Sequence, residues 1–105
     1  MRRFAWSIVV TAGCVSAVPL PTEREAATAR RTDPTATIES LKHGRDRYVT
    51  KCSGCHSLYA PRDKTASEWP PVLEKMSVKA KCGEEERRAI EQYLLAVVGT
   101  PDANH

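Results

Sequence analysis

The sequence has few aromatic residues and little that would build a β-sheet or a membrane span. Aromatic residues make up 6% of its 105 residues. No stretch alternates apolar and polar residues as a half-buried strand would, and no segment repeats another. The longest apolar run, from Phe4 to Ala12, is too short to cross a bilayer as a mature helix. A chain of this length and pattern is one domain at most, and we expect it to be all-α.

A strong charge of one sign is also absent. Sixteen basic and 13 acidic residues give a formal net charge of +3, which falls to +1 when Arg2 and Arg3 leave with a signal peptide. Proteins that bind nucleic acids normally concentrate far more positive charge. The composition therefore excludes a strongly basic nucleic-acid binder.

The N-terminus has the pattern of an export signal, since two arginines precede the short apolar run. Two cleavage sites are open. The stretch Thr11 to Cys14 resembles a bacterial lipobox, which would leave a lipid-bearing Cys14 at the head of the mature chain. The stretch Val15 to Ala17 suits an ordinary signal peptidase, and Cys14 would then be removed. We predict an exported, periplasmic protein whose only membrane contact would be an anchor at Cys14.

The remaining chain divides by composition. Residues 15–37 contain almost no large apolar side chains, so we expect a disordered linker that tethers the domain flexibly. The alternative is that part of it packs on the domain as an irregular arm. The predicted organisation is a signal and lipobox region at 1–14, the linker, a folded domain at 38–100 and a C-terminal tail at 101–105.

The motif Cys52-Ser53-Gly54-Cys55-His56 is the most informative part of the sequence. Two thiols at this spacing, followed directly by an imidazole, are what covalent haem c attachment needs. Each thiol would bond one haem vinyl group, and His56 would bind the iron as proximal ligand. One such motif predicts one covalent haem c, which would also complete the core of so small a domain.

Two other chemistries use a pair of cysteines. A structural zinc site needs four ligands, but Cys14 and Cys82 are single and distant, and His43 and His105 are isolated. A dithiol redox motif favours a βαβ setting, whereas a helical pattern precedes this motif. Both alternatives are therefore weaker than haem attachment.

Helical periodicity predicts a first helix from about Ile38 to Lys51. Gly44 lies on its apolar stripe, where it costs about 1 kcal/mol relative to alanine. Close contact with a crossing helix would explain this glycine. The stripe consists of Ile38, Leu41, Tyr48 and Val49.

A second helix is predicted from about Glu84, where three glutamates favour a helix N-terminus, to Gly99 and Pro101. Between the two, Ser67 is a candidate N-cap for a short helix that would stop near Lys75, just before Met76. The apolar face of the second helix consists of Ile90, Tyr93, Leu94, Val97 and Val98.

Together these residues resemble a small class I cytochrome c, over about Ile38 to Val98. Gly44, Tyr48 and Cys52 match the family's spacing before the haem motif, and its C-terminal helix has an aliphatic followed by an aromatic-Leu pair, as at Ile90, Tyr93 and Leu94. The resemblance implies an all-α fold in which the N- and C-terminal helices cross around a covalently bound haem. It also implies a short helix before the loop of the distal Met.

The resemblance extends to other haem contacts. The stretch Leu58 to Pro61 resembles the family's haem-edge loop, where the Pro61 carbonyl would accept the proximal His N–H. The stretch Glu68 to Pro70 resembles the segment that leads to the distal Met. Tyr59, Trp69 and Arg62 are thus candidates to pack on the ring or bond a propionate, although ordinary core or surface roles would explain them too.

Met76 is the predicted distal iron ligand. It is the only Met besides Met1 and lies off the stripes of both long helices. A thioether suits haem iron, and His/Met ligation raises the reduction potential. The alternatives are a core-filling Met76 or ligation by His43, which lies on the opposite side of its helix from Tyr48.

A His/Met-ligated iron has no open position for a substrate, so we predict an electron carrier between redox partner proteins and not an enzyme. One alternative is a haem sensor or peroxidase-like protein with an open sixth site. Another is an electron-entry subunit of a larger oxidoreductase.

Two smaller features have two interpretations each. Cys82 could be a small buried hydrophobe or a reactive thiol. A cluster of lysines could be a ring that docks an acidic partner or an ordinary solvated face. The cluster consists of Lys64, Lys75, Lys79 and Lys81.

Overall fold

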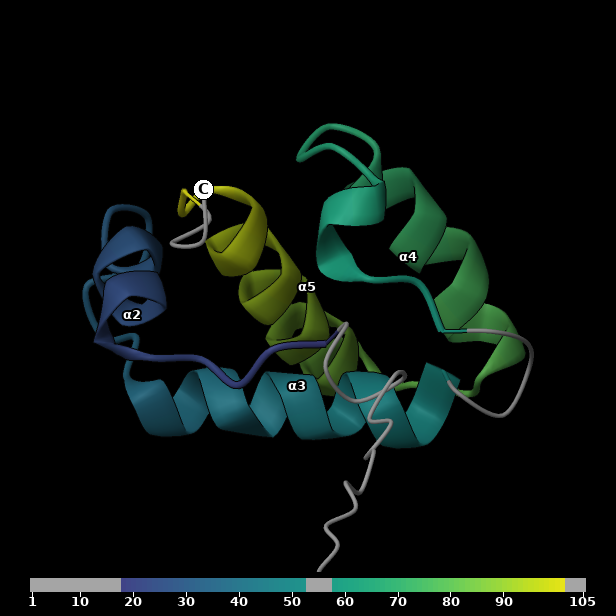
Figure 1. Cartoon of the computed structure of the whole chain (residues 1–105). Coiled ribbons are helices and arrows are strands. Elements are labelled where there is room, and N and C mark those ends of the chain that lie inside the picture. The colour runs from purple at the N-terminus through teal and green to yellow at the C-terminus, as the bar shows by residue number, and fades with distance from the viewer. Residues whose placement is uncertain (1–17, 53–57, 102–105) are drawn as a thin grey trace, which may run out of the picture.

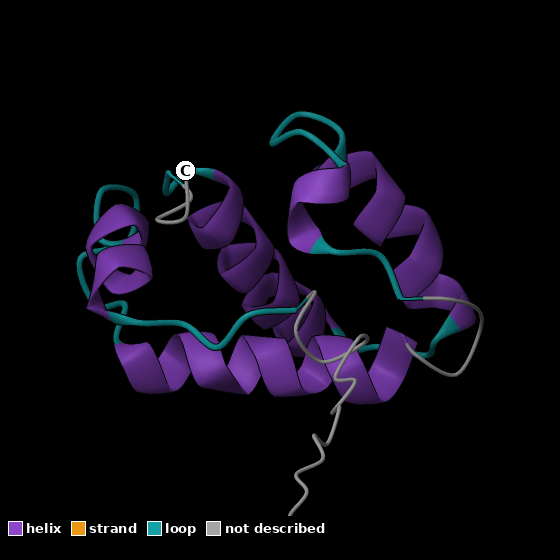
Figure 2. Ribbon diagram, viewed as in Figure 1, coloured by secondary structure: helices purple, strands orange, loops and turns teal. Residues whose placement is uncertain are grey.

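A computed structural model describes residues 18–52 and 58–101, and this part of the chain contains helices and loops but no strand (Figure 2). The all-α expectation is confirmed at this level. Among the described residues, no helix is both long and apolar enough to cross a bilayer. The elements are α2 (Glu23–Ala29), α3 (Ile38–Cys52), the 3₁₀ turn η1 (Pro61–Asp63), α4 (Trp69–Lys79) and α5 (Glu84–Val98).

Helix α5 is the centre of the fold and crosses α3, while α2 and α4 lie on either side of it (Figure 1). It contacts α2, α3, α4 and η1. The predicted bounds of the two long helices are confirmed to within a residue. The apolar stripe of α5 is also confirmed, because Ile90, Tyr93, Leu94 and Val97 are all buried.

Gly44 sits where α3 crosses α5, as the sequence predicted. A Cβ atom built on it would lie 2.1 Å from the carbonyl oxygen of Ala89 and 3.0 Å from the Cβ of Tyr93. No side chain fits in that space. The backbones of the two helices therefore touch at this point, which accounts for a glycine inside a helix.

The segment expected to be a disordered linker is folded from Val18 onward, and that expectation is wrong for residues 18–37. Thr22 and Glu25 form a capping box that starts α2. The segment has few large apolar side chains, and small alanines allow its close approach to α3 and α5. These are Ala26, Ala29 and Ala36, which pack with Leu41 and Ala96.

Polar bonds hold the same arm, residues 18–37, to the rest of the domain. The Arg45 guanidinium donates to the Val18 carbonyl at 2.9 Å, and the Tyr93 hydroxyl donates to the Pro19 carbonyl. Gln92 donates to Asp33 at 3.0 Å. The Val18 side chain is 1% exposed and belongs to the main core cluster, so the arm is an integral part of the fold.

Helix α4 differs from its prediction at both ends. Ser67 does not cap it. Instead Thr65 and Glu68 bond reciprocally, with the Thr65 N–H donating to the Glu68 carboxylate at 2.8 Å and the Glu68 N–H to the Thr65 hydroxyl at 3.2 Å. The helix also continues to Lys79, one turn past the expected end, which places Met76 inside it.

A Schellman motif ends α4. The Cys82 N–H bonds the Ser77 carbonyl at 2.9 Å and the Lys81 N–H bonds that of Val78 at 3.2 Å. Lys81 supplies the left-handed residue that this motif needs, with φ of 58°. Glycine usually takes that position because a side chain there costs about 1–2 kcal/mol.

Lys81→Gly is therefore expected to stabilise the protein by about 0.5–1 kcal/mol, after the extra unfolded-state entropy of glycine is counted. Denaturant unfolding measures the change. Lys75→Gly is the matched control, because it has the same composition but lies inside α4, where it should cost about 1 kcal/mol. Equal effects at the two positions would contradict the argument.

Candidate functional site

Cys52 is the part of the haem motif that the structure describes. It is the last residue of α3, and at 6% exposure it belongs to the same core cluster as Tyr48, Trp69 and Leu73. The first thiol thus enters the core from the end of a helix fixed by the Gly44 crossing. Cys55 and His56 lie outside the described residues, as does Cys14.

A pocket of about 340 Å³ brings two predicted site residues together, Tyr59 and Met76. Met76 is half-buried, and Val72 precedes it by one turn on the same side of α4. Val72 was missed by the sequence reasoning, although its spacing of four from Met76 could have indicated it. The other residues that line the pocket are Lys64, Pro71 and Lys75.

Trp69 and Pro61, also predicted to contact the cofactor, lie in the core next to this pocket and do not line it. Trp69 is fully buried, and its indole N–H donates to the Pro61 carbonyl at 2.8 Å. Its ring meets that of Tyr48 edge to face, with centroids 6.0 Å apart. Their predicted contacts with a haem and its proximal ligand stay predictions, while this bond gives both a role in holding α4 to η1.

A hydrogen bond to its backbone carbonyl holds Tyr59 in place, and its side chain lines the pocket. Its carbonyl accepts a hydrogen bond from the Tyr48 hydroxyl at 2.6 Å, and burial raises the pKa of that hydroxyl far above its usual range. The Tyr59 side chain is partly exposed, with the Lys64 ammonium 4.5 Å from the centre of its ring. Tyr48 of α3 thereby positions one wall of the pocket.

Arg62 donates hydrogen bonds to backbone carbonyls at the C-terminal end of α5. Its guanidinium donates to the carbonyl of Val97 at 2.9 Å and to that of Thr100. Val97 lies in the last turn of α5, and Thr100 follows the end of that helix. The bonds tie η1 to α5, so the structure gives Arg62 a structural role where the sequence offered it for a propionate.

The pocket residues fit a haem c in three respects. Met76 offers a soft thioether sulfur. Val72, Pro71 and the Tyr59 ring offer apolar surface for a porphyrin face. The two lysines, Lys64 and Lys75, offer positive charge for its two carboxylates. The group would supply one-electron redox chemistry here, and these side chains would hold it.

Cys82 behaves as the small hydrophobe that the sequence favoured. Its side chain is half-buried against the main core cluster. Burial, and then the nearby Glu86 carboxylate, raise the pKa of its thiol. A raised pKa leaves less thiolate at neutral pH, which lowers nucleophilic reactivity.

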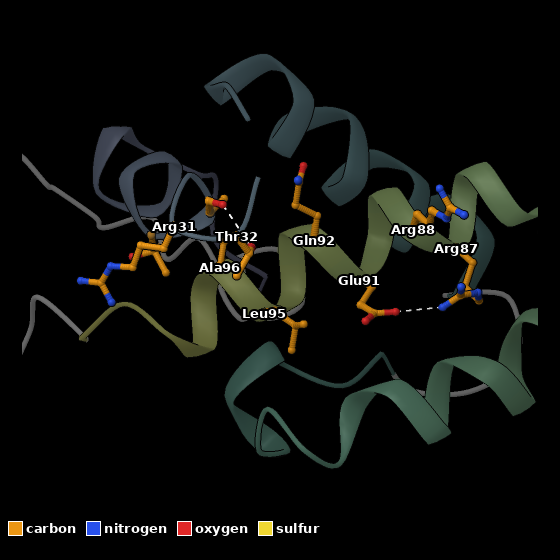
Figure 3. A pocket seen from close by; sticks show the side chains of 10 residues that line it. Arg31, Thr32, Arg87, Arg88, Glu91, Gln92, Leu95 and Ala96 are labelled. Carbon is orange, nitrogen blue, oxygen red and sulfur yellow. Dashed lines mark hydrogen bonds and ion pairs between the residues drawn. The ribbon is translucent and has the colours of Figure 1, made fainter. Parts of the chain in front are cut away.

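A second pocket, of about 530 Å³, lies between the arm and α5 (Figure 3). Arg87 on its rim bonds Glu84 at 2.6 Å and Glu91 at 2.8 Å, so its charge is neutralised locally. This pocket contains none of the predicted site residues. Within residues 18–52 and 58–101, no group of three or more His, Cys, Asp and Glu side chains could hold a metal ion.

Comparison of the chain with protein-family models, curated proteins and solved structures gave no match.

Proposed function

We propose that this chain carries one covalent haem c and transfers single electrons between redox partner proteins outside the cytoplasm. The observation that carries the proposal is that Cys52, the first residue of the haem motif, ends α3 inside the core, while Met76 lines a pocket with apolar and basic walls. The motif supplies the attachment and a proximal imidazole, and the pocket supplies a distal thioether. The export signal is consistent with attachment outside the cytoplasm.

Each part of the chain would have a defined task in such a carrier. The Gly44 crossing fixes the end of α3 and hence the first attachment point. The buried Trp69–Pro61 bond fixes the start of α4, and two further turns of that helix place Met76 at the pocket. Rigid ligand positions would allow the iron to change oxidation state with little rearrangement, and Val72, Pro71 and the Tyr59 ring would cover part of the porphyrin.

The choice between a carrier and a haem sensor or peroxidase-like protein depends on Met76. A Met on the iron leaves no position for oxygen or peroxide, whereas an open site would bind both. Met76 lies inside a helix that follows the Thr65–Glu68 bonds and ends in a Schellman motif. This placement favours a fixed ligand, and with it the carrier.

The test is Met76→Ala in the haem-loaded protein. Wild-type protein should show the weak red absorption band of thioether-bound ferric haem and, when reduced, should bind carbon monoxide poorly. The variant should lose the band and bind carbon monoxide readily. Its reduction potential should fall by an amount on the order of 0.1–0.3 V, because the thioether that raises the potential is lost and water can take its place on the iron.

Val72→Ala is the matched control, since it removes apolar volume from the same wall of the pocket but no ligand. It should keep the band. Wild-type protein that lacks the band and binds carbon monoxide rapidly would refute the carrier and favour the sensor or enzyme.

A further inference from the structure

Val18, the first residue of the arm, is buried. Only 1% of its surface is exposed, and it packs in the main core cluster, which also contains Cys52. The Arg45 guanidinium donates to the Val18 carbonyl at 2.9 Å, and the Tyr93 hydroxyl donates to the next carbonyl, that of Pro19. From this point the arm runs along α3 to α2 (Figure 1). The side chain and the backbone of Val18 are therefore both held inside the fold.

This burial distinguishes the two cleavage sites that the sequence leaves open. Cleavage after Ala17 would make Val18 the first residue of the mature chain, with a free α-amino group that is mostly protonated at neutral pH. The new ammonium would lie in an apolar cluster, on the residue whose carbonyl already binds the positive Arg45. An unpaired charge in such surroundings is strongly unfavourable. Withdrawal of Val18 from the core would relieve the charge but would expose a buried side chain, so this fold disfavours a start at Val18.

Cleavage before Cys14 avoids the conflict. Residues 14–17 would stay attached, and the nitrogen of Val18 would belong to an uncharged peptide bond. The stretch Thr11 to Cys14 is also the one that resembles a lipobox. A second observation agrees with a lipid nearby: Leu20 lies six positions after Cys14 between two prolines, and 63% of its surface is exposed. An exposed apolar side chain this close to an anchor can contact a bilayer surface.

We infer that Cys14 is the N-terminal residue of the mature protein and carries a diacylglyceryl group on its sulfur. A membrane glycerophospholipid would donate the group. A bond forms between Sγ and the glyceryl carbon, the bond from that carbon to the phosphate oxygen breaks, and the thiol proton leaves with the phosphorylated headgroup. Hydrolysis of the peptide bond between Gly13 and Cys14 then frees the α-amino group of Cys14. This modification goes beyond the proposed function and does not depend on the haem.

Two chains with different starts test the effect of a free amino group at Val18. Both are exported with an ordinary cleavable signal peptide, so that one mature chain begins at Val15 and the other at Val18. The chain that begins at Val15 should melt at least about 5 °C higher, because it keeps Val18 buried without a charge. Equal melting temperatures would show that the core accepts the new N-terminus and would contradict the preference for Cys14.

Fatty-acid labelling and the intact mass of the mature protein test the modification itself. The full chain is exported in a bacterium that modifies lipoproteins and is supplied with labelled palmitate. The wild type should take up the label and should have the mass of residues 14–105 plus the lipid and any bound haem. The label should survive neutral hydroxylamine, which cleaves a thioester but leaves the thioether of a diacylglyceryl cysteine.

Cys14→Ala should lose the label completely. Cys82→Ala is the matched control, since it removes another thiol of the same chain, and it should keep the label. Wild-type protein without fatty acid, or with Val18 as its first residue, would overturn the modification and leave the electron carrier standing. Labelled wild-type protein without haem would refute the proposed function and leave the modification in place.

Discussion

Replacing both Cys52 and Cys55 with alanine is expected to abolish all haem that survives denaturation. In the wild type, haem held by thioether bonds should stay with the chain on a denaturing gel and should resist extraction with acidified acetone. The double variant should lose the stain completely and should yield little folded protein, because a domain this small buries little surface without the cofactor. Haem staining and the yield of folded protein measure the two effects.

Cys82→Ala provides the matched control for this experiment. It removes a thiol from the same domain, one that packs half-buried against the same core cluster. Its haem content should equal that of the wild type, with a loss of stability of about 1 kcal/mol at most. Complete extraction of haem from the wild type by acidified acetone would contradict covalent attachment.

Gly44→Ala is expected to cause a large loss of stability although it adds only one methyl group. The new Cβ would meet the Ala89 carbonyl oxygen at 2.1 Å, and that oxygen is backbone, so a helix must move. Overpacking typically costs 1–3 kcal/mol or somewhat more, and the gain in helix propensity returns about 1 kcal/mol. A net loss of about 2 kcal/mol should lower the melting temperature by roughly 8–16 °C.

Gly83→Ser is the control for this substitution. Nothing lies within 4 Å of a Cβ on Gly83. Gly83 is also the N-cap of α5 and has no side-chain cap bond, so a serine hydroxyl there should leave stability unchanged or raise it by about 0.3 kcal/mol. Similar losses at Gly44 and Gly83 would show that the helix crossing is looser than its geometry implies.

The long helices were predictable because each bears a local and a global signal. In α5, the glutamates at its start and the spacing of Ile90, Tyr93, Leu94 and Val97 agree on the helix and on its buried face. In α3, Gly44 is costly locally, and that cost pointed to the crossing partner. A residue that breaks a local rule inside a regular pattern thus carried information about tertiary contact.

The arm was missed for a different reason. Its burial depends on alanines, whose small side chains resemble those of a disordered segment in composition. What distinguishes it is the capping box of Thr22 and Glu25 and the shape of the surface that receives Ala26 and Ala29. The capping box could have been found in the sequence, whereas the receiving surface exists only once α3 and α5 have packed.

The end of α4 was misplaced because its stop signal is unusual. A lysine, Lys81, occupies the left-handed position where glycine is expected, so the sequence does not show where the helix ends. At the pocket, the sequence indicated Tyr59 and Met76 but could not show that Trp69 turns its N–H toward Pro61. That bond depends on the distance between η1 and α4, which local patterns do not encode.

Val18 is docked in the core, which would limit how far the domain could move from a lipid anchor at Cys14. Val18 is four positions after Cys14, and such a stretch extends at most about 14 Å. A lipid at Cys14 would therefore tether the domain close to the bilayer surface, where it could rotate but could not move far from the membrane. Redox partners would then have to bind at the membrane surface. A longer tether, made by inserting glycine and serine residues before Val18, would let the domain reach partners farther from the membrane.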